Sequence, residues 1–154
     1  VSNAMSNPLK ATKFGLPFRH VPTYLAGYYK YKAGDQFTEG GKPVNGKRDI
    51  CDIYAIMYET SESVPTLDGT NAFTSPNLIS TARINNAKET NEWTYFKLPF
   101  TTLPGKFIDK EKLMDGKYNI AIVFTSSLEG DHFNGAIGST LLIDEAELIY
   151  HSED

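Results

Sequence analysis

Two apolar segments near the end of the chain most constrain what it can fold into. Residues 118–124 alternate large apolar side chains with smaller ones, and residues 140–143, Thr-Leu-Leu-Ile, form a second apolar run. A period of two places alternate side chains on opposite faces of a strand, so both segments predict β-strands. We expect residues 118–124 to form a central strand and the two segments to pair in one buried sheet.

The remainder of the chain favours more strands over long helices. Its 12 glycines and 8 prolines interrupt it at short intervals. Residues 108–113 predict one helical turn, and no segment predicts a helix long enough to cover a sheet. We therefore expect an all-β protein, a jelly-roll β-sandwich of two antiparallel sheets. The further strands are expected at residues 13–18, 23–32, 49–59, 78–84 and 91–100.

The length and composition fit a single globular domain. Of the 154 residues, 40% are hydrophobic and 22% are charged, which is enough apolar material for a full core. We assign residues 1–8 to a linker or a cloning remnant and residues 9–151 to one domain. The predicted core contains Ile53, Phe96, Leu98, Ile120, Ile122, Phe124 and Leu142.

Charge and cysteine content exclude several classes of function. The net charge is −4 and the 15 lysines and arginines are scattered, so nucleic acid is not an expected partner. No apolar run approaches the roughly 20 residues that span a bilayer, so we expect no membrane insertion by this domain. Cys51, the single cysteine, cannot form an intramolecular disulfide and is interpreted as a small buried residue.

The sequence contains no catalytic signature, and we assign no catalytic or metal-binding residue. The 3 histidines are far apart and lack the spacing of zinc ligands. No cofactor is expected, with one alternative: the acidic residues 144–147 could hold a structural calcium ion, or could be outward charges of an edge strand. Acidic side chains on predicted strands leave a hydrolytic carboxyl pair open as a hypothesis. They are Asp49, Asp52, Glu59, Asp144, Glu145 and Glu147.

Aromatic side chains on the predicted strands favour sugar binding, because flat rings stack on pyranose rings. Trp93 begins a strand, follows a polar segment and shares its face with Tyr95 and Lys97. We take Trp93 as the first stacking surface and Tyr31 as the second. Each ring could instead be part of the core or of an ordinary sheet surface.

A glycine-rich loop supplies polar groups for sugar hydroxyls. Glu129, Asp131, His132 and Asn134 offer two carboxyl groups, an imidazole and an amide within six residues. The alternative is a wide hairpin turn with no ligand. Loops gather at the ends of a sandwich, so residues 34–47, 61–77 and 129–138 are expected to shape the site.

Four segments of the chain resemble one known family. They are FGLPF at 14–18, GYYKYKAGD at 27–35, DIYA at 52–55 and the block 126–145. Together they are similar to the putative carbohydrate metabolism domain of glycan-degrading gut bacteria. The resemblance covers residues 14–150 and implies a jelly-roll fold in a carbohydrate context. It also implies an exported lipoprotein, located at the cell surface, in the outer membrane or in the periplasm. In such a protein an immunoglobulin-like part precedes this domain, and the export signal lies upstream of residue 1.

We therefore predict a glycan-binding domain of a cell-surface or periplasmic carbohydrate-utilisation protein, with an oligo- or polysaccharide as partner. Two alternatives stay open: a glycoside hydrolase that uses a carboxylate pair, and a structural or protein-interaction domain. The hydrolase requires two facing carboxyl groups in a cleft. The binding domain requires an exposed aromatic pair, and the interaction domain requires a flat apolar patch of several hundred Å².

Overall fold

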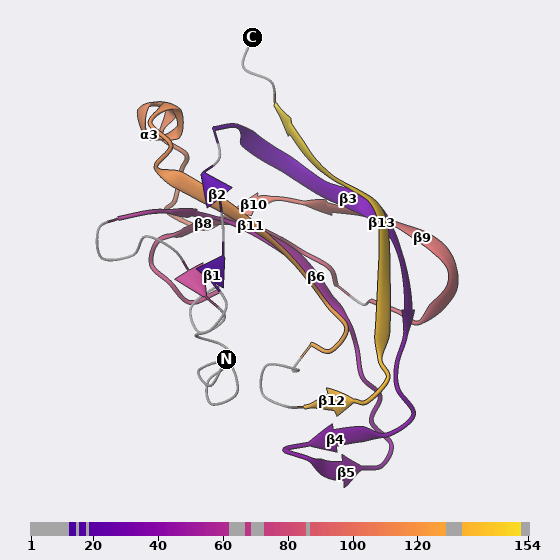
Figure 1. Ribbon diagram of the computed structural model, residues 1–154. Coiled ribbons are helices and arrows are strands. Elements are labelled where there is room, and N and C mark those ends of the chain that lie inside the picture. Colours follow the sequence, from indigo (N-terminus) through magenta and orange to yellow (C-terminus); the bar gives the residue numbers. More distant parts are fainter. Residues whose placement is uncertain are drawn as a thin grey trace.

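The computed structural model describes residues 13–14, 16–17, 19–61, 67–68, 73–85, 87–128 and 134–151, almost all of them in strands or their connections (Figure 1). Two antiparallel sheets account for most of these residues. We call them the β6 sheet and the β3 sheet. The β6 sheet has the order β10 (Thr101–Thr102), β8 (Leu78–Arg83), β6 (Asp52–Glu59), β11 (Tyr118–Thr125), β2 (Leu16–Pro17); the β3 sheet has the order β13 (Thr140–His151), β3 (Val21–Lys32), β9 (Thr90–Pro99).

Two smaller sheets complete the all-β architecture. The hairpin sheet joins β12, β4 and β5, and β1 pairs with β7. The prediction of an all-β chain with antiparallel sheets is confirmed, and a sandwich is consistent with it. The strand order does not establish a jelly roll, which stays a prediction. The bounds of the smaller strands are β12 (Gly135–Ala136), β4 (Phe37–Glu39), β5 (Lys42–Val44), β1 (Lys13–Phe14) and β7 (Leu67–Asp68).

The main core lies between the β6 sheet and the β3 sheet and draws side chains from both. β6 is buried on its two faces, as its apolar pattern on both faces predicts. Burial raises the pKa of the Cys51 thiol to about 11, which fits its interpretation as an inert core residue. The buried members of this core are Leu25, Tyr29, Tyr31, Ala33, Cys51, Ile53, Ala55, Ala82, Phe96 and Leu98.

The expected pairing of the two C-terminal strands is wrong. β11 pairs with β6 along its whole length, from Tyr118 opposite Glu59 to Thr125 opposite Asp52. β13 pairs instead with β3, in the other sheet. Apolar content predicts that a strand is buried, but it does not say which neighbouring strand supplies the hydrogen bonds.

Three residues predicted in the core are exposed, and the remaining four are buried. Ile122 and Phe124 are 41% and 37% exposed, although they lie opposite the buried Ala55 and Ile53 of β6. Leu142 is 49% exposed because its register opposite Lys30 turns it to the outer face of the β3 sheet. Ile53, Phe96, Leu98 and Ile120 are buried as predicted.

The predicted helical turn is present as α3 (Lys110–Met114). Asp109 is its N-cap, and its side chain accepts hydrogen bonds from the backbone N–H groups of Glu111 and Lys112. Leu113 is buried against Tyr118 and Met57, so the helix closes one end of the β6 sheet. Figure 1 shows it above the start of β11.

A buried carboxyl group fixes the hairpin sheet to the sandwich. Asp49 Oδ2 accepts hydrogen bonds from Ser127 Oγ, from Ser139 Oγ at 2.6 Å and from the Ala136 backbone N at 3.0 Å. Its Oδ1 accepts from the Ile50 backbone N at 2.9 Å. We call this arrangement the Asp49 clasp. It ties the segment before β6 to the segments on either side of β12 and so sets where the hairpin sheet lies.

A second carboxyl group links β9 to the same end of the molecule. Glu89 accepts two hydrogen bonds from the Arg48 guanidinium, at 2.7 and 2.8 Å, and one from the Ala33 backbone N at 2.9 Å. The bonds from Arg48, and then that from Ala33, lower the pKa of Glu89 from 4.5 to about 2. The folded protein therefore holds this proton less tightly than the unfolded chain does.

Glu89→Gln should flatten the acid dependence of stability. A lowered folded-state pKa stabilises the fold fully above pH 4.5, and this contribution disappears as the pH falls from 4.5 to about 2. The Glu89 side chain is 39% exposed, so the difference from wild type should be below about 1 kcal/mol at pH 7. Urea unfolding at several pH values measures it, with Glu92→Gln, an exposed residue three positions further on, as the control. A difference that stays constant from pH 6 to pH 2 would contradict the expectation.

Candidate functional site

The outer face of the β3 sheet carries a group of exposed aromatic side chains, Tyr28, Trp93 and Tyr95. Strand alternation sends Leu25, Tyr29 and Tyr31 into the core, so the even-numbered residues of β3 point outward. On β9, Phe96 and Leu98 are buried and the odd-numbered residues point outward. The predicted faces of residues 93–98 are thereby confirmed. The outward aromatic residues are Tyr24 and Tyr28 on β3 and Trp93 and Tyr95 on β9; with Lys30 and Lys97 we call them the aromatic face.

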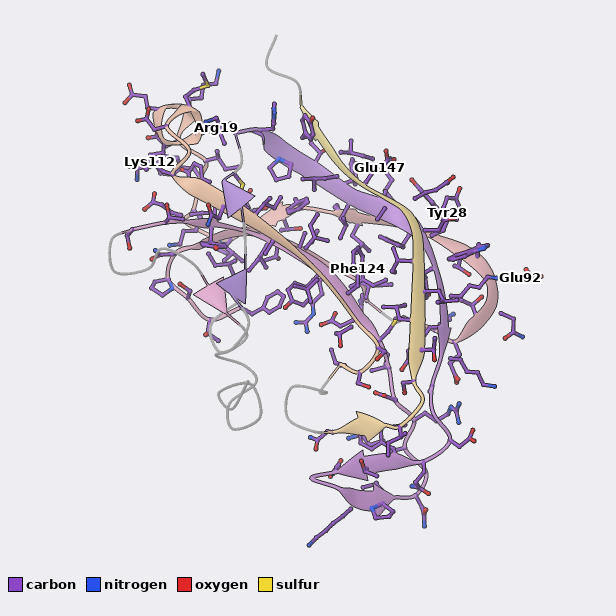
Figure 2. All side chains as sticks on the ribbon, in the orientation of Figure 1. Arg19, Tyr28, Glu92, Lys112, Phe124 and Glu147 are labelled. Atoms are coloured by element: carbon purple, nitrogen blue, oxygen red, sulfur yellow. The ribbon has the colours of Figure 1, made fainter. Side chains whose placement is uncertain are left out.

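Register brings these rings together. Tyr28 lies directly opposite Tyr95, and their ring centroids are 5.2 Å apart with an interplanar angle of 54°. Trp93 is two residues before Tyr95 on the same face of β9. The exposed fractions are 36% for Tyr28, 52% for Tyr95 and 44% for Trp93, which leaves ring surface available to a ligand. Figure 2 shows Tyr28 on the side of the β3 sheet away from β6 and β11.

Two lysines contact rings of this face. Lys30 Nζ lies 4.7 Å from the centre of the Trp93 ring, and Lys97 Nζ lies 4.3 Å from the centre of the Tyr24 ring. Each is a cation–π contact, which fixes an ammonium group beside an aromatic surface. The lysines are on opposite sides of the Tyr28–Tyr95 pair along the strands, because Lys30 follows Tyr28 by two residues and Lys97 follows Tyr95 by two on an antiparallel strand.

Acidic residues lie on the third strand of the same sheet. Asp144 is opposite Tyr28 and Glu147 is opposite Ala26, both on β13. Between them the register shifts, and Glu145 adopts a φ of 50°, a left-handed conformation that marks a β-bulge. Gly27, across from the bulge, permits it: an added Cβ would lie 2.9 Å from the Phe96 ring and 3.1 Å from Ala146 Cα. The bulge returns Glu147 to the outer face, where Figure 2 shows it.

The structure corrects one predicted site residue. Tyr31 is 2% exposed and donates a hydrogen bond through its hydroxyl to the Ser126 carbonyl at 2.6 Å. Burial is the first cause that raises its pKa to about 12. Its ring belongs to the core, so it cannot stack on a sugar. Its odd-numbered position in β3, shared with Leu25 and Tyr29, was the signal against it.

The predicted polar loop is only partly described. Glu129, Asp131 and His132 lie outside the described residues. Asn134 Oδ1 accepts a hydrogen bond from the Gly40 backbone N at 3.0 Å, so this amide links the loop to the turn between β4 and β5. Asn134 is beside the hairpin sheet, whereas Trp93 is on the β3 sheet. The structure thus does not place Asn134 on the aromatic face.

Where the structure describes them, the segments predicted as binding loops contain strands or hydrogen-bonded residues. Residues 34–47 contain the hairpin of β4 and β5, and most of residues 61–77 lie outside the described part. Residues 134–138 are held by the Asp49 clasp through Ala136 N. The prediction placed most of the binding residues in loops and left out the sheet residues next to Trp93. The alternating Tyr and Lys of residues 28–32 and 93–97 were the sequence signal for them.

Three of the six acidic residues that could form a hydrolytic pair have separate partners. Asp49 belongs to the clasp, and Asp52 receives two hydrogen bonds from the Arg83 guanidinium, at 2.7 and 3.2 Å. Glu59 forms an ion pair with Lys112 Nζ at 2.7 Å. Arg83 also lies over the rings of Phe73 and Tyr54, so this ion pair is packed on the other face of the β6 sheet.

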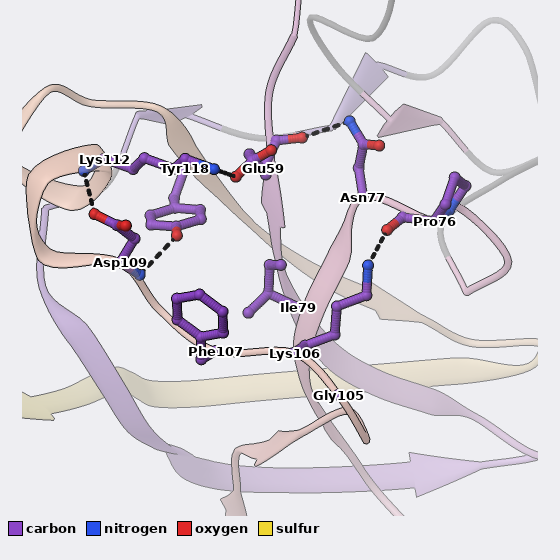
Figure 3. A pocket seen from close by; sticks show the side chains of 10 residues that line it. All are labelled: Glu59, Pro76, Asn77, Ile79, Gly105, Lys106, Phe107, Asp109, Lys112 and Tyr118. Atoms are coloured by element: carbon purple, nitrogen blue, oxygen red, sulfur yellow. Dashed lines mark hydrogen bonds and ion pairs between the residues drawn. The ribbon is translucent and has the colours of Figure 1, made fainter.

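Glu59 and Asp109 do line one pocket together. It lies at the end of the β6 sheet, has a volume of about 160 Å³ and is lined by Glu59, Asp109, Tyr118 and the 71% exposed Phe107, among others (Figure 3). Glu59 is paired with Lys112, and Asp109 caps α3. Ligand pockets usually measure roughly 300–1,000 Å³, so this one is small even for part of a glycan.

Within the described ranges, no group of three or more His, Cys, Asp or Glu side chains could hold a metal ion. The calcium hypothesis for residues 144–147 involved an N-terminal loop of which most residues are not described, and it stays a prediction. In the part of the chain that the structure describes, no helix is long and apolar enough to cross a membrane.

Comparison with known proteins decides the family. The model of the putative carbohydrate metabolism domain matches residues 1–149, nearly the whole chain. The chain belongs to this family. The resemblance seen in the four sequence segments is thereby confirmed, and the protein is a carbohydrate-related domain. Among functionally curated proteins, none matches the chain.

Two solved structures are similar over almost the full chain. One, described as a putative glycoside hydrolase from Bacteroides thetaiotaomicron, is 89% identical with a TM-score of 0.97; the match covers 99% of this chain and 45% of that one. The other, described in the same words and from Bacteroides vulgatus, is 47% identical with a TM-score of 0.91; the match covers 97% of this chain and 60% of that one. The chain thus spans about half the length of these relatives.

Proposed function

We propose that this chain is a non-catalytic glycan-binding domain and that the aromatic face is its binding surface. The observation that carries the proposal is the exposed cluster of Tyr28, Trp93 and Tyr95 on one sheet face. Soluble proteins seldom leave large rings grouped in water without a partner. Flat rings with polar groups at their edges suit pyranose rings, which have apolar C–H faces and hydroxyls around the rim.

The family membership supports a sugar as the partner of this face. The fold supplies a rigid base for it, because β3 is paired on both edges and packs its inner side into the main core. The proposal includes the location that the family resemblance implies. The domain would belong to an exported carbohydrate-utilisation protein at the cell surface or in the periplasm.

The test is a glycan screen of the 154-residue chain by array and affinity gel, with Trp93→Ala beside wild type. Removing the indole should weaken binding about tenfold, since a stacked ring contributes on the order of 1 kcal/mol beyond area burial. Stability should change little, because Trp93 is 44% exposed. Phe107→Ala is the matched control, an exposed ring away from the β3 sheet, and should leave binding unchanged. Unchanged affinity in Trp93→Ala would reject the aromatic face as the site.

Glycoside hydrolysis is the second candidate, favoured by the description of the two Bacteroides relatives and by the pocket with Glu59 and Asp109. Retaining and inverting enzymes need two carboxyl groups about 5–9.5 Å apart, one of them free to give a proton. Glu59 and Asp109 instead serve an ion pair and a helix cap. Hydrolysis assays on every glycan that binds, with Glu59→Gln and Asp109→Asn, separate the candidates. Turnover that either variant abolishes would replace the binding proposal with the enzyme.

A further inference from the structure

We propose that the aromatic face selects acidic glycans, whose sugar units carry a carboxylate or a sulfate group. This inference rests on the proposed function and adds the chemical class of the ligand. It begins from the two ammonium groups of the face. Among the residues that the structure describes, neither Lys30 nor Lys97 forms an ion pair with an acidic side chain; their recorded partners are the Trp93 and Tyr24 rings.

This pairing differs from that of other lysines in the protein. Lys47 and Lys112 each contact a carboxylate, at 2.9 and 2.7 Å. In the described part of the chain, Lys30 and Lys97 have no carboxylate within ion-pair distance and lie on a surface rich in rings. A ring stabilises a cation through its quadrupole but does not neutralise it, so each ammonium keeps the capacity to bind an anion.

The positions of the two lysines fit an anionic sugar. They lie on either side of the Tyr28–Tyr95 pair along the strands, at its edge and not over it. A pyranose stacked on this pair presents its exocyclic groups at the ring rim, roughly in the plane of the sugar. A carboxylate or sulfate at that rim can therefore reach an ammonium of Lys30 or Lys97 while the C–H face of the sugar contacts the tyrosines.

The acidic residues of the same face give the ligand a direction. Asp144 and Glu147 lie on β13, on the side of β3 opposite to β9. They would repel an anionic group from that side and favour it on the β9 side, near Lys97 and Trp93. Like-charge repulsion and an attractive partner on the opposite edge together give a preferred orientation. Glu145 is in the bulge, and Glu92 is at the start of β9; both are exposed and add negative charge at the border of the face.

The experiment compares ligands that differ only in charge. Polygalacturonate is tested beside the same polymer in fully methyl-esterified form, and dextran sulfate beside dextran, by affinity gel with the full chain. We expect tighter retention by at least one charged member than by its neutral counterpart, and we expect the difference to shrink as salt rises from 50 to 500 mM. Exposed charge pairs are screened over about 10 Å at 0.1 M salt.

Charge-removing variants test the residues. Lys30→Met and Lys97→Met keep the aliphatic stem and remove the ammonium, and each should weaken retention on the charged polymer about two- to fivefold. The double variant should retain both members of a pair equally. Lys42→Met, on β5 and away from the face, should behave as wild type.

Each outcome decides between the two proposals. Equal retention of charged and neutral polymers, with a loss in Trp93→Ala, overturns the acidic preference and leaves the glycan-binding proposal intact. A charge preference that survives in the double lysine variant overturns the assignment of Lys30 and Lys97. Retention of neutral polymers alone also rejects the inference. A chain that retains none of the four polymers, and binds nothing in the glycan screen, rejects the proposed function itself.

Discussion

Replacing Asp49 with alanine should destabilise the fold by about 3 kcal/mol, which is a large share of the stability of a domain this size. Asp49 is 6% exposed and accepts four hydrogen bonds. Without its carboxyl group, the Ala136 N–H and the hydroxyls of Ser127 and Ser139 lose their acceptor inside the protein. An unsatisfied buried polar group costs roughly 1–3 kcal/mol, and the two hydroxyls can partly recover by rotating.

Urea unfolding of the Asp49→Ala variant measures the loss, and Asp35→Ala, an exposed carboxyl in the neighbouring turn, is the control. Asp35→Ala should lie within about 0.5 kcal/mol of wild type. Ser139→Ala should show a smaller loss than Asp49→Ala, because it removes one donor to Asp49 and one acceptor for the Gly34 N–H. An Asp49→Ala variant as stable as wild type would show that the clasp does not hold the hairpin sheet.

The sequence predicted the faces of the strands better than their neighbours. Alternation placed Phe96 and Leu98 inside and Trp93 outside, because side-chain direction along one strand follows from local geometry alone. It could not place Ile122 and Phe124, which are exposed although they lie opposite the buried Ala55 and Ile53 of β6. Sheet order and strand edges are set by contacts between distant segments, and no periodicity within a segment records them.

The difference between local strand geometry and contacts of distant segments also explains which features of the site could be predicted. Trp93 was predicted as exposed because its alternation with Phe96 is local. The pairing of Tyr28 with Tyr95, and the contact of Lys30 with Trp93, come from the register of β3 against β9. The polar loop offered many functional groups, but Asn134 is hydrogen bonded to Gly40, 94 residues away. Loop composition shows which groups are present and does not show which are already satisfied.

Removing both β9 rings should reduce glycan affinity about a hundredfold. Each stacked ring is expected to contribute near 1.4 kcal/mol, a factor of ten in affinity, and Trp93 and Tyr95 are two residues apart, or about 6.8 Å along the strand. Rings at that separation can contact different parts of a sugar chain, so Trp93→Ala and Tyr95→Ala should be additive within about 0.5 kcal/mol. Isothermal titration with the glycan found in the screen gives each affinity.

Tyr28 and Tyr95 should behave differently, because their rings are in contact at 5.2 Å and form one surface. Removing either ring leaves the other without its neighbour, so the second removal should cost less than the first, by 0.5 kcal/mol or more. Thermal melts of the three single and two double variants must stay near wild type, as the exposure of the three rings predicts. Additive losses for Tyr28 with Tyr95 would mean that these two rings do not form one surface for the ligand. Strong coupling between Trp93 and Tyr95 would mean that the ligand does not contact these two rings independently.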